Sequence, residues 1–266
     1  MQTKPNVLIL RTEGTNCDEE LAFAFAQAGG NPQFVHVNDL REKRKRLKDF
    51  NILALPGGFS YGDDVVSGKI LAVELTSFFE EELKKFVGRK DTLTIGVCNG
   101  FQVLVRTGLL PFNTPENMQA TLVNNDSGHF ECRWIKLRIN DKNNSPFLKD
   151  LGNTIVTYQV AHGEGKFFAP KKTLAAIGKK HLVALQYIDE KGNPTQQYPE
   201  NPNGALHAIA GITDETGRIF GLMPHPERFV LKQQYPNWRR ETLRQAQGKP
   251  HGLPIFENAI EFCKYI

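Results

Sequence analysis

The chain has 266 residues, of which 40% are hydrophobic and 23% are charged, and its formal net charge is +4 at pH 7. This ordinary globular composition can bury a substantial core, and the lack of any run of about 18 apolar residues predicts no membrane contact. The net charge is small and no nucleic-acid-binding signature occurs, so we expect no binding to nucleic acid. A strand is expected almost at the start, with no secretory signal before it, so we expect a cytoplasmic protein.

Strands and helices are predicted to alternate in the first half of the chain. Apolar stretches that read as buried strands lie at residues 6–10, 33–37, 52–55 and 93–97. Between them we expect a helix from a cap at Thr15 or Asn16 to Ala28, a solvent-facing helix around the basic run 41–46, and a helix within 67–87. This alternation predicts a parallel sheet that is covered on both faces.

Short strands between turns are predicted in the second half. They are expected within 130–139 and at 155–160, 182–187, 208–212 and 219–223. Two helices, 238–247 and 255–265, are expected to follow. No linker divides the chain, so residues 1–266 are predicted to form a single α/β domain. Its sheet should be open and mainly parallel (flavodoxin-like), with helices on both faces and antiparallel strands added in the second half.

Cys98 lies where the predicted strand 93–97 ends and a helix begins, in the string GVCNGFQ. A cysteine at such a turn is pushed out of the strand, and the free N–H groups of the new helix stabilise a thiolate. We therefore predict that Cys98 is a nucleophile. The other cysteines are widely spaced with no C-x-x-C pair, and we expect Cys17, Cys132 and Cys263 to be free, buried thiols.

A thiolate nucleophile needs a base, and the base needs an orienting group. Two His-x-Glu patterns occur, His162 with Glu164 and His225 with Glu227, and residues two apart in an extended segment point to the same side. We favour His225 and Glu227, because they follow the strand predicted at 219–223 and are held extended by neighbouring prolines. The other pair lies among glycines, in a more mobile loop that suits a substrate edge or partner contact. Neither pair has a third metal ligand, so no metal is expected.

The segment after the third predicted strand, residues 56–63, reads PGGFSYGD and leaves the same edge of the sheet as Cys98. It is not a phosphate-binding loop, because no Walker string occurs, and no G-x-G-x-x-G follows the first strand. We expect it to supply backbone N–H donors instead. Together, the N–H groups of Gly58 and Asn99 would form an oxyanion hole.

These residues resemble the class I (triad) glutamine amidotransferases. Four strings also fall in the order typical of one group within them, the glutaminase subunits of phosphoribosylformylglycinamidine synthases: PGGFSYGD at 56–63, AHGEG at 161–165, NPNG at 201–204 and MPHPER at 223–228. The resemblance extends from Val7 to about Arg228, and the tail after Phe229 has no matching motif. Phe101 stands where these proteins more often have a second cysteine.

The resemblance implies that Cys98 attacks the side-chain amide of L-glutamine, that His225 transfers protons and that Glu227 orients His225. Gln102 and Gly57 are expected to border the bound glutamine. The ammonia should pass to a large synthetase subunit, in some members with a small bridging subunit. ATP and magnesium are expected on that partner, and no cofactor on this chain.

Two other functions are compatible with the sequence. One is a related cysteine hydrolase that acts alone, such as a γ-glutamyl hydrolase. The other is a non-enzymatic binding subunit that kept the fold, against which the presence of Cys98, His225 and Glu227 together argues.

Overall fold

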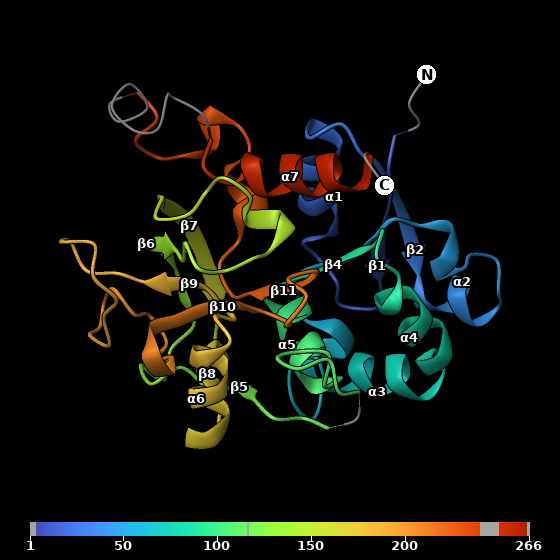
Figure 1. Ribbon diagram of the computed structural model, residues 1–266, viewed down its shortest axis with the longest axis horizontal. Helices are drawn as coiled ribbons and strands as arrows, with labels where there is room; N and C mark the ends of the chain where they lie inside the picture. The colour runs from blue at the N-terminus through green and yellow to red at the C-terminus, as the bar shows by residue number, and fades with distance from the viewer. Residues whose placement is uncertain (1–3, 116, 240–249, 265–266) are drawn as a thin grey trace.

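A nine-stranded mixed sheet runs through the molecule in the computed structural model, which describes residues 4–115, 117–239 and 250–264 (Figure 1). Its strand order is β2-β1-β3-β4-β11-β10-β9-β6-β7. The strands are β1 (Asn6–Arg11), β2 (Asn31–His36), β3 (Ile52–Leu55), β4 (Leu93–Val97), β6 (Glu131–Ile139), β7 (Ile155–His162), β9 (Val183–Tyr187), β10 (Ile209–Thr213) and β11 (Ile219–Leu222). A separate two-stranded antiparallel sheet pairs β5 (Thr121–Val123) with β8 (Lys166–Phe168).

The sheet changes direction halfway across. From β2 to β11 every neighbouring pair is parallel, and from β11 through β10, β9 and β6 to β7 every pair is antiparallel. The central strands β3, β4 and β11 are buried along their whole length, as expected for parallel strands that are covered on both faces. The predicted α/β fold, with antiparallel strands added in the second half, is confirmed.

Helices cover both faces of the parallel part (Figure 1). On one face, α1 (Asp18–Gln27) packs against α7 (Leu253–Lys264), with the rings of Phe25 and Phe256 edge to face at 5.0 Å between centroids. The opposite face carries α3 (Lys69–Ser77), α4 (Glu80–Gly88) and α5 (Asn99–Arg106). The other two helices are α2 (Val37–Arg41), which is the shortest of those described, and α6 (Lys171–Lys179). Within the described ranges, no helix is long and apolar enough to cross a membrane.

Two helix predictions for the first half were wrong in their details. Helix α1 has Cys17 as its N-cap residue, so neither Thr15 nor Asn16 caps it. The basic run 41–46 is not a helix, because α2 ends at Arg41 and the chain then turns. In this turn the guanidinium of Arg44 reaches back to the carboxylates of Asp39 and Glu42, contacts that a continuing helix would not allow.

Other differences lie between and after the central strands. The helix expected within 67–87 is divided into α3 and α4, since the chain turns at Phe79 to bury that ring. Helix α6 and the two-stranded sheet of β5 and β8 were not predicted. The final helix is confirmed as α7, whereas the one predicted at 238–247 falls mainly on residues 240–249, which lie outside the described residues.

The carboxyl ends of β3, β4 and β11 lie next to one another, because these three strands are parallel neighbours. The segments that follow them contain Gly57, Cys98 and His225. The crevice outside the carboxyl ends of parallel strands is where ligands bind in open α/β sheets. The fold therefore brings the predicted site residues to one edge.

Candidate active site

Cys98 occupies a sharp turn between β4 and α5. Its backbone has φ 52° and ψ −107°, a conformation that is strained for a residue with a side chain. Hydrogen bonds hold the turn on both sides: Cys98 N–H donates to the Leu222 carbonyl at 2.8 Å, and Cys98 O accepts from the N–H groups of Phe101 and Gln102. The helix also packs unusually close to β3, because a Cβ on Gly100 would lie 2.0 Å from the Leu55 oxygen.

His225 and Glu227 form a buried pair beside this turn. Nδ1 of His225 lies 2.5 Å from Oε1 of Glu227, and each residue is only 1% exposed. The backbone N–H of His225 donates to the Gln159 carbonyl on β7 at 2.8 Å, which ties the pair to the sheet. The chain enters a 3-10 turn at Pro226, so a turn brings the two side chains together and not the extended strand that the sequence suggested.

The electrostatics of the pair favour a charged imidazole. Burial opposes the charge on His225, but the carboxylate of Glu227 and the sulfur of Cys98 outweigh it and raise the pKa of His225 to about 10. Nε2 of His225 is buried and has no hydrogen-bond partner among the described residues. The thiol of Cys98 donates to the Ala161 carbonyl at 3.7 Å. The unpaired Nε2 is therefore the ring atom that could exchange a proton with a reacting group.

Gly57 and Gly58 follow β3, and Gly57 lies against the same two side chains. A Cβ on Gly57 would be 2.8 Å from Cε1 of His225 and 3.4 Å from Cβ of Cys98. Gly58 has φ +125°, which only glycine adopts readily. Neither Gly58 N–H nor Asn99 N–H donates a hydrogen bond within the described parts of the chain. Their use as an oxyanion hole stays a prediction.

Gln102 connects α5 to the segment after β7. Its Nε2 donates to the Glu164 carbonyl at 2.7 Å, and its Oε1 accepts from Nδ2 of Asn99 at 3.0 Å. Asn99 is itself bound by Ser60 and Asp63 of the loop after β3. Burial and the nearby charge of Glu164 both raise the pKa of Asp63. The contact of Gln102 with glutamine stays a prediction. The Gln102 side chain connects the start of α5 to the segment after β7.

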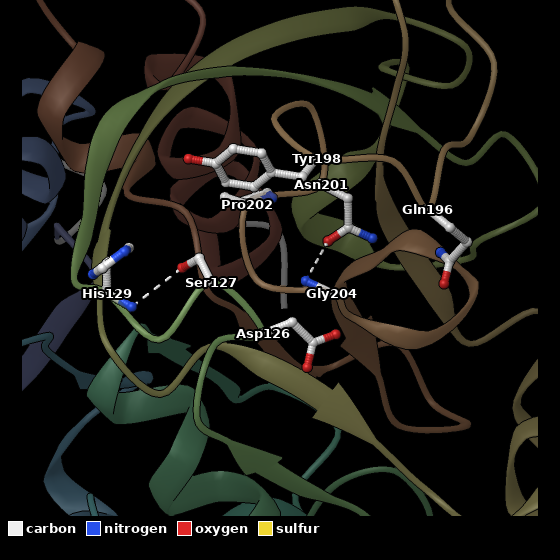
Figure 2. Close-up of a pocket in the computed structure, with 8 residues that line it drawn as sticks. All are labelled: Asp126, Ser127, His129, Gln196, Tyr198, Asn201, Pro202 and Gly204. Carbon is white, nitrogen blue, oxygen red and sulfur yellow. Dashed lines mark hydrogen bonds between the residues drawn. The ribbon is translucent and has the colours of Figure 1, made fainter.

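The segment around His162 is not the mobile loop that its glycines suggested. His162 is only 3% exposed, and its ring contacts the side chains of Asn125 and Asn203. A Cβ on Gly165 would lie 2.3 Å from the His162 ring, so this glycine permits close packing and not mobility. The loops that carry the two asparagines line a surface cavity of about 390 Å³, with residues 126–129 on one side and 196–204 on the other (Figure 2).

Sequence analysis missed the contact between Arg228 and Cys17. The Arg228 guanidinium donates to Sγ of Cys17 at 3.2 Å, to Oε1 of Glu20 at 3.0 Å and to Oε1 of Gln159 at 3.2 Å. Burial and the charge of Glu227 raise the pKa of Cys17, so this thiol stays protonated. The only signal in the sequence was the position of Arg228 directly after Glu227.

The remaining cysteines, Cys132 and Cys263, lie on β6 and α7. Cys132 is exposed and Cys263 is partly exposed, so the prediction that both are buried was wrong. On β6 the side chains of Ile135, Leu137 and Ile139 face the core, which turns Cys132 outward. Among the described residues, no group of three or more His, Cys, Asp or Glu side chains is placed to hold a metal ion.

Comparisons with known proteins agree with this geometry. The model of the CobB/CobQ-like glutamine amidotransferase domain matches residues 4–263. Phosphoribosylformylglycinamidine synthase subunit PurQ of Dehalococcoides mccartyi is 44% identical over 264 residues, which cover 99% of this chain and 100% of the relative. The PurQ subunit of Methanococcus maripaludis strain S2 is 39% identical over 268 residues, 97% of each chain.

A solved structure extends the likeness to three dimensions. A chain in the structure of PurLQS from Thermotoga maritima superposes with a TM-score of 0.73 at 28% identity, covering 98% of this chain and 99% of the other. The match therefore includes the added antiparallel strands as well as the parallel core. The chain belongs to the glutamine amidotransferase family and, within it, to the PurQ subunits of phosphoribosylformylglycinamidine synthase.

Proposed function

We propose that this chain is the glutaminase subunit of phosphoribosylformylglycinamidine synthase. It hydrolyses L-glutamine and supplies ammonia for the ATP-dependent conversion of formylglycinamide ribonucleotide to formylglycinamidine ribonucleotide in purine biosynthesis. The observation that supports this most directly is the buried His225–Glu227 pair beside Cys98, which stands at a strained strand–helix turn. A nucleophile, a base and an orienting carboxylate are the three groups that amide cleavage through a thioester needs.

In the first step, the Cys98 thiolate attacks the side-chain amide carbon of glutamine. The carbonyl electrons move onto oxygen, and the N–H groups of Gly58 and Asn99 stabilise this oxyanion. His225 then gives the proton on Nε2 to the amide nitrogen, the C–N bond breaks, and ammonia leaves. A γ-glutamyl thioester remains on Cys98, and His225 is neutral.

In the second step, His225 takes a proton from water, and the resulting hydroxide attacks the thioester. The C–S bond breaks, glutamate is released, and the thiolate–imidazolium pair is restored. Throughout, Glu227 keeps the proton on Nδ1 and stabilises the charged ring, as the carboxylate of a triad does. Gln102 and Gly57 border the bound glutamine.

Ammonia released into neutral water is protonated and no longer attacks an electrophile, so we propose that it passes directly to a partner. The partner is a large synthetase subunit that binds ATP and magnesium, in some assemblies joined through a small bridging subunit. This chain needs no cofactor of its own, and it works in the cytoplasm. The assembly named PurLQS in Thermotoga maritima supports a multi-subunit arrangement.

The test is a Cys98→Ala variant in the reconstituted synthase. Glutamine-dependent synthesis should be lost, whereas synthesis from added ammonia should stay at the wild-type rate, because the partner site is intact. Glutamine-dependent synthesis that persisted in this variant would overturn the assignment of Cys98.

A glutamine analogue that alkylates active-site thiols separates the other functions. Modification of Cys98 in the presence of the partner supports the glutaminase. No modification under those conditions supports a binding subunit, and a γ-glutamyl peptidase activity that needs no partner supports a stand-alone hydrolase.

A further inference from the structure

His162 ends β7 next to Cys98, and both nitrogens of its ring are occupied. Nδ1 lies 3.1 Å from Oδ1 of Asn125, and Nε2 lies 3.5 Å from Nδ2 of Asn203. A carbonyl oxygen only accepts and an amide nitrogen only donates, so Nδ1 carries the proton and Nε2 accepts. These contacts select one neutral tautomer of the ring.

The surroundings of His162 also favour the neutral form. Burial lowers the pKa of His162 to about 3, and the positive charges of His225 and Arg133 act in the same direction. The carboxylate of Glu131, opposite His162 on β6, is already paired with Arg133 at 3.1 Å. His162 therefore fits neither a general base nor a group that titrates near neutral pH.

The two asparagines cannot release the ring without losing other hydrogen bonds. Asn125 is buried, and its Nδ2 donates to the carbonyls of His162 at 2.8 Å and His129 at 2.9 Å. Asn203 is fully buried, its Nδ2 donates to the Tyr187 hydroxyl at 3.0 Å, and its Oδ1 accepts from Ala205 N–H. Since an unpaired buried amide is costly, both asparagines are held in place.

The His162 ring and the two asparagines that hold it, Asn125 and Asn203, are called the clamp below. The clamp holds the end of β7 against Cys98. The carbonyl of Ala161, the residue before His162, accepts from the Cys98 thiol at 3.7 Å. On the other side, the N–H of Asn125 donates to the Gly163 carbonyl at 2.9 Å. The position of the carbonyl that faces the sulfur is thus set by a ring and two amides that do not themselves contact the sulfur.

The clamp also reaches the surface of the molecule. Asn203 lies between Pro202 and Gly204, which line the cavity of Figure 2, and Asp126 across the cavity donates its N–H to the Asn203 carbonyl at 3.2 Å. The backbone that forms the cavity wall is therefore the backbone that carries the clamp.

We propose that His162 is a positioning residue for glutamine cleavage: its neutral ring, held by Asn125 and Asn203, fixes the Ala161 carbonyl against the sulfur of Cys98. This proposal rests on the proposed function, in which Cys98 is the nucleophile. Without the clamp, the strand end and the thiol shift relative to each other, and a misplacement of about 1 Å costs on the order of 10²-fold in rate. Because the contact that the clamp fixes is with the sulfur of Cys98, we expect kcat to fall more than KM rises.

The test compares three variants in the reconstituted synthase. His162→Ala should lower kcat for glutamine on the order of 10²-fold, with a smaller change in KM and with ammonia-dependent synthesis unchanged. Asn125→Asp places a carboxylate against Nδ1, so the ring should gain a proton near neutral pH and kcat should acquire an ionisation that the wild type lacks. Asn193→Asp adds the same charge on an exposed turn and should match the wild type.

A purely structural role would lower stability in Asn125→Asp without adding an ionisation to kcat. Full kcat in both His162→Ala and Asn125→Asp, with activity still dependent on Cys98, would overturn the positioning role and leave the proposed function intact. If His162→Ala does not fold, the positioning role is tested by the pH profile of Asn125→Asp and by the NMR titration of the wild-type His162 ring. A wild-type His162 that titrates between about pH 6 and 8, as an unperturbed histidine does, would also contradict the proposal.

Discussion

The imidazole of His225 and the carboxylate of Glu227 are 2.5 Å apart in a fully enclosed part of the protein. Hydrogen bonds between a charged donor and a charged acceptor are stronger than those between neutral groups. Because the ring is buried, its proton is stable only while the carboxylate is present. The pair therefore acts as one unit, and removing either member changes the charge of the other.

Glu227→Gln should lower kcat for glutamine by about 10²- to 10⁴-fold. The amide removes the negative charge that stabilises the imidazolium, so His225 loses the proton that it must give to the leaving ammonia. Steady-state kinetics of the reconstituted synthase measure this effect. Glu190→Gln, at an exposed turn, is the matched control. A Glu227→Gln variant with wild-type kcat would exclude Glu227 from the reaction.

The same pair predicts how stability changes with pH. The pKa of His225 is about 10 in the native state against 6.5 for an ordinary histidine, so the native state retains a proton that the unfolded chain releases. This stabilisation is complete below about pH 6.5 and is lost as the pH rises through about 10. The stability difference between the wild type and Glu227→Gln should therefore shrink over this range, by up to about 1.4 kcal/mol per pH unit. Urea unfolding of both proteins at several pH values measures this difference in the free energy of unfolding. A difference that stays constant with pH would contradict the raised pKa of His225.

Gly57→Ala should impair catalysis by steric pressure alone. The added methyl group would lie 2.8 Å from the His225 ring and 3.2 Å from Sγ of Cys17, so the imidazole must move. We expect a loss on the order of 10²-fold in kcat and a destabilisation of about 1–3 kcal/mol. Gly178→Ala in α6, where nothing lies within 4 Å of the new Cβ, should keep full activity. Equal activity of the two variants would show that Gly57 does not confine His225.

Gln102→Ala should act mainly on glutamine binding. The change leaves the Glu164 carbonyl without this donor and removes one of the two acceptors of the Asn99 amide, and a loss of about 1.4 kcal/mol in binding raises KM about tenfold. Gln102→Glu should be worse, because a carboxylate cannot donate to the Glu164 carbonyl and lies near the negative charges of Asp63 and Glu164. Both KM values for glutamine are measured with ammonia-dependent synthesis as the internal control. An unchanged KM in Gln102→Glu would exclude this role.

The four thiols should differ in reactivity according to their surroundings. Burial raises the pKa of Cys17 and raises that of Cys263 to about 12, so at pH 7 both are protonated and unreactive. A glutamine analogue should modify Cys98 alone, whereas iodoacetamide should also modify the exposed Cys132. Peptide mass mapping gives the sites. Modification of Cys17 by the glutamine analogue would show that the site lies closer to α1 than proposed.

Much of the parallel core could be predicted because its signals are local. Strands β3 and β4 read as continuous apolar runs, since both of their faces are buried. The turn at Cys98 was predictable for the same reason: strand, small residues and helix follow one another directly. The basic run 41–46 failed as a prediction because composition allows a helix, whereas the backbone leaves the helical region at Lys43, where φ is 61°.

Which side chains contact one another in the candidate active site was harder to predict, because these contacts join residues far apart in the sequence. His225 and Glu227 were paired by assuming an extended segment, and a 3-10 turn produces the same pairing. Arg228 and Cys17 are 211 residues apart, and His162 meets its two asparagines across 37 and 41 residues. No periodicity or spacing records such contacts.

Local sequence thus located the strand–helix turn at Cys98, the Gly57-Gly58 loop and the positions along the chain of the strands of the first half, because hydrophobic period, turn residues and helix starts act over a few residues. Tertiary structure alone decided that His225 is buried and charged while His162 is buried and neutral, although both stand in a His-x-Glu pattern. The reason is what each ring packs against. A carboxylate from the adjoining turn faces His225, and two neutral amides brought in by distant loops face His162.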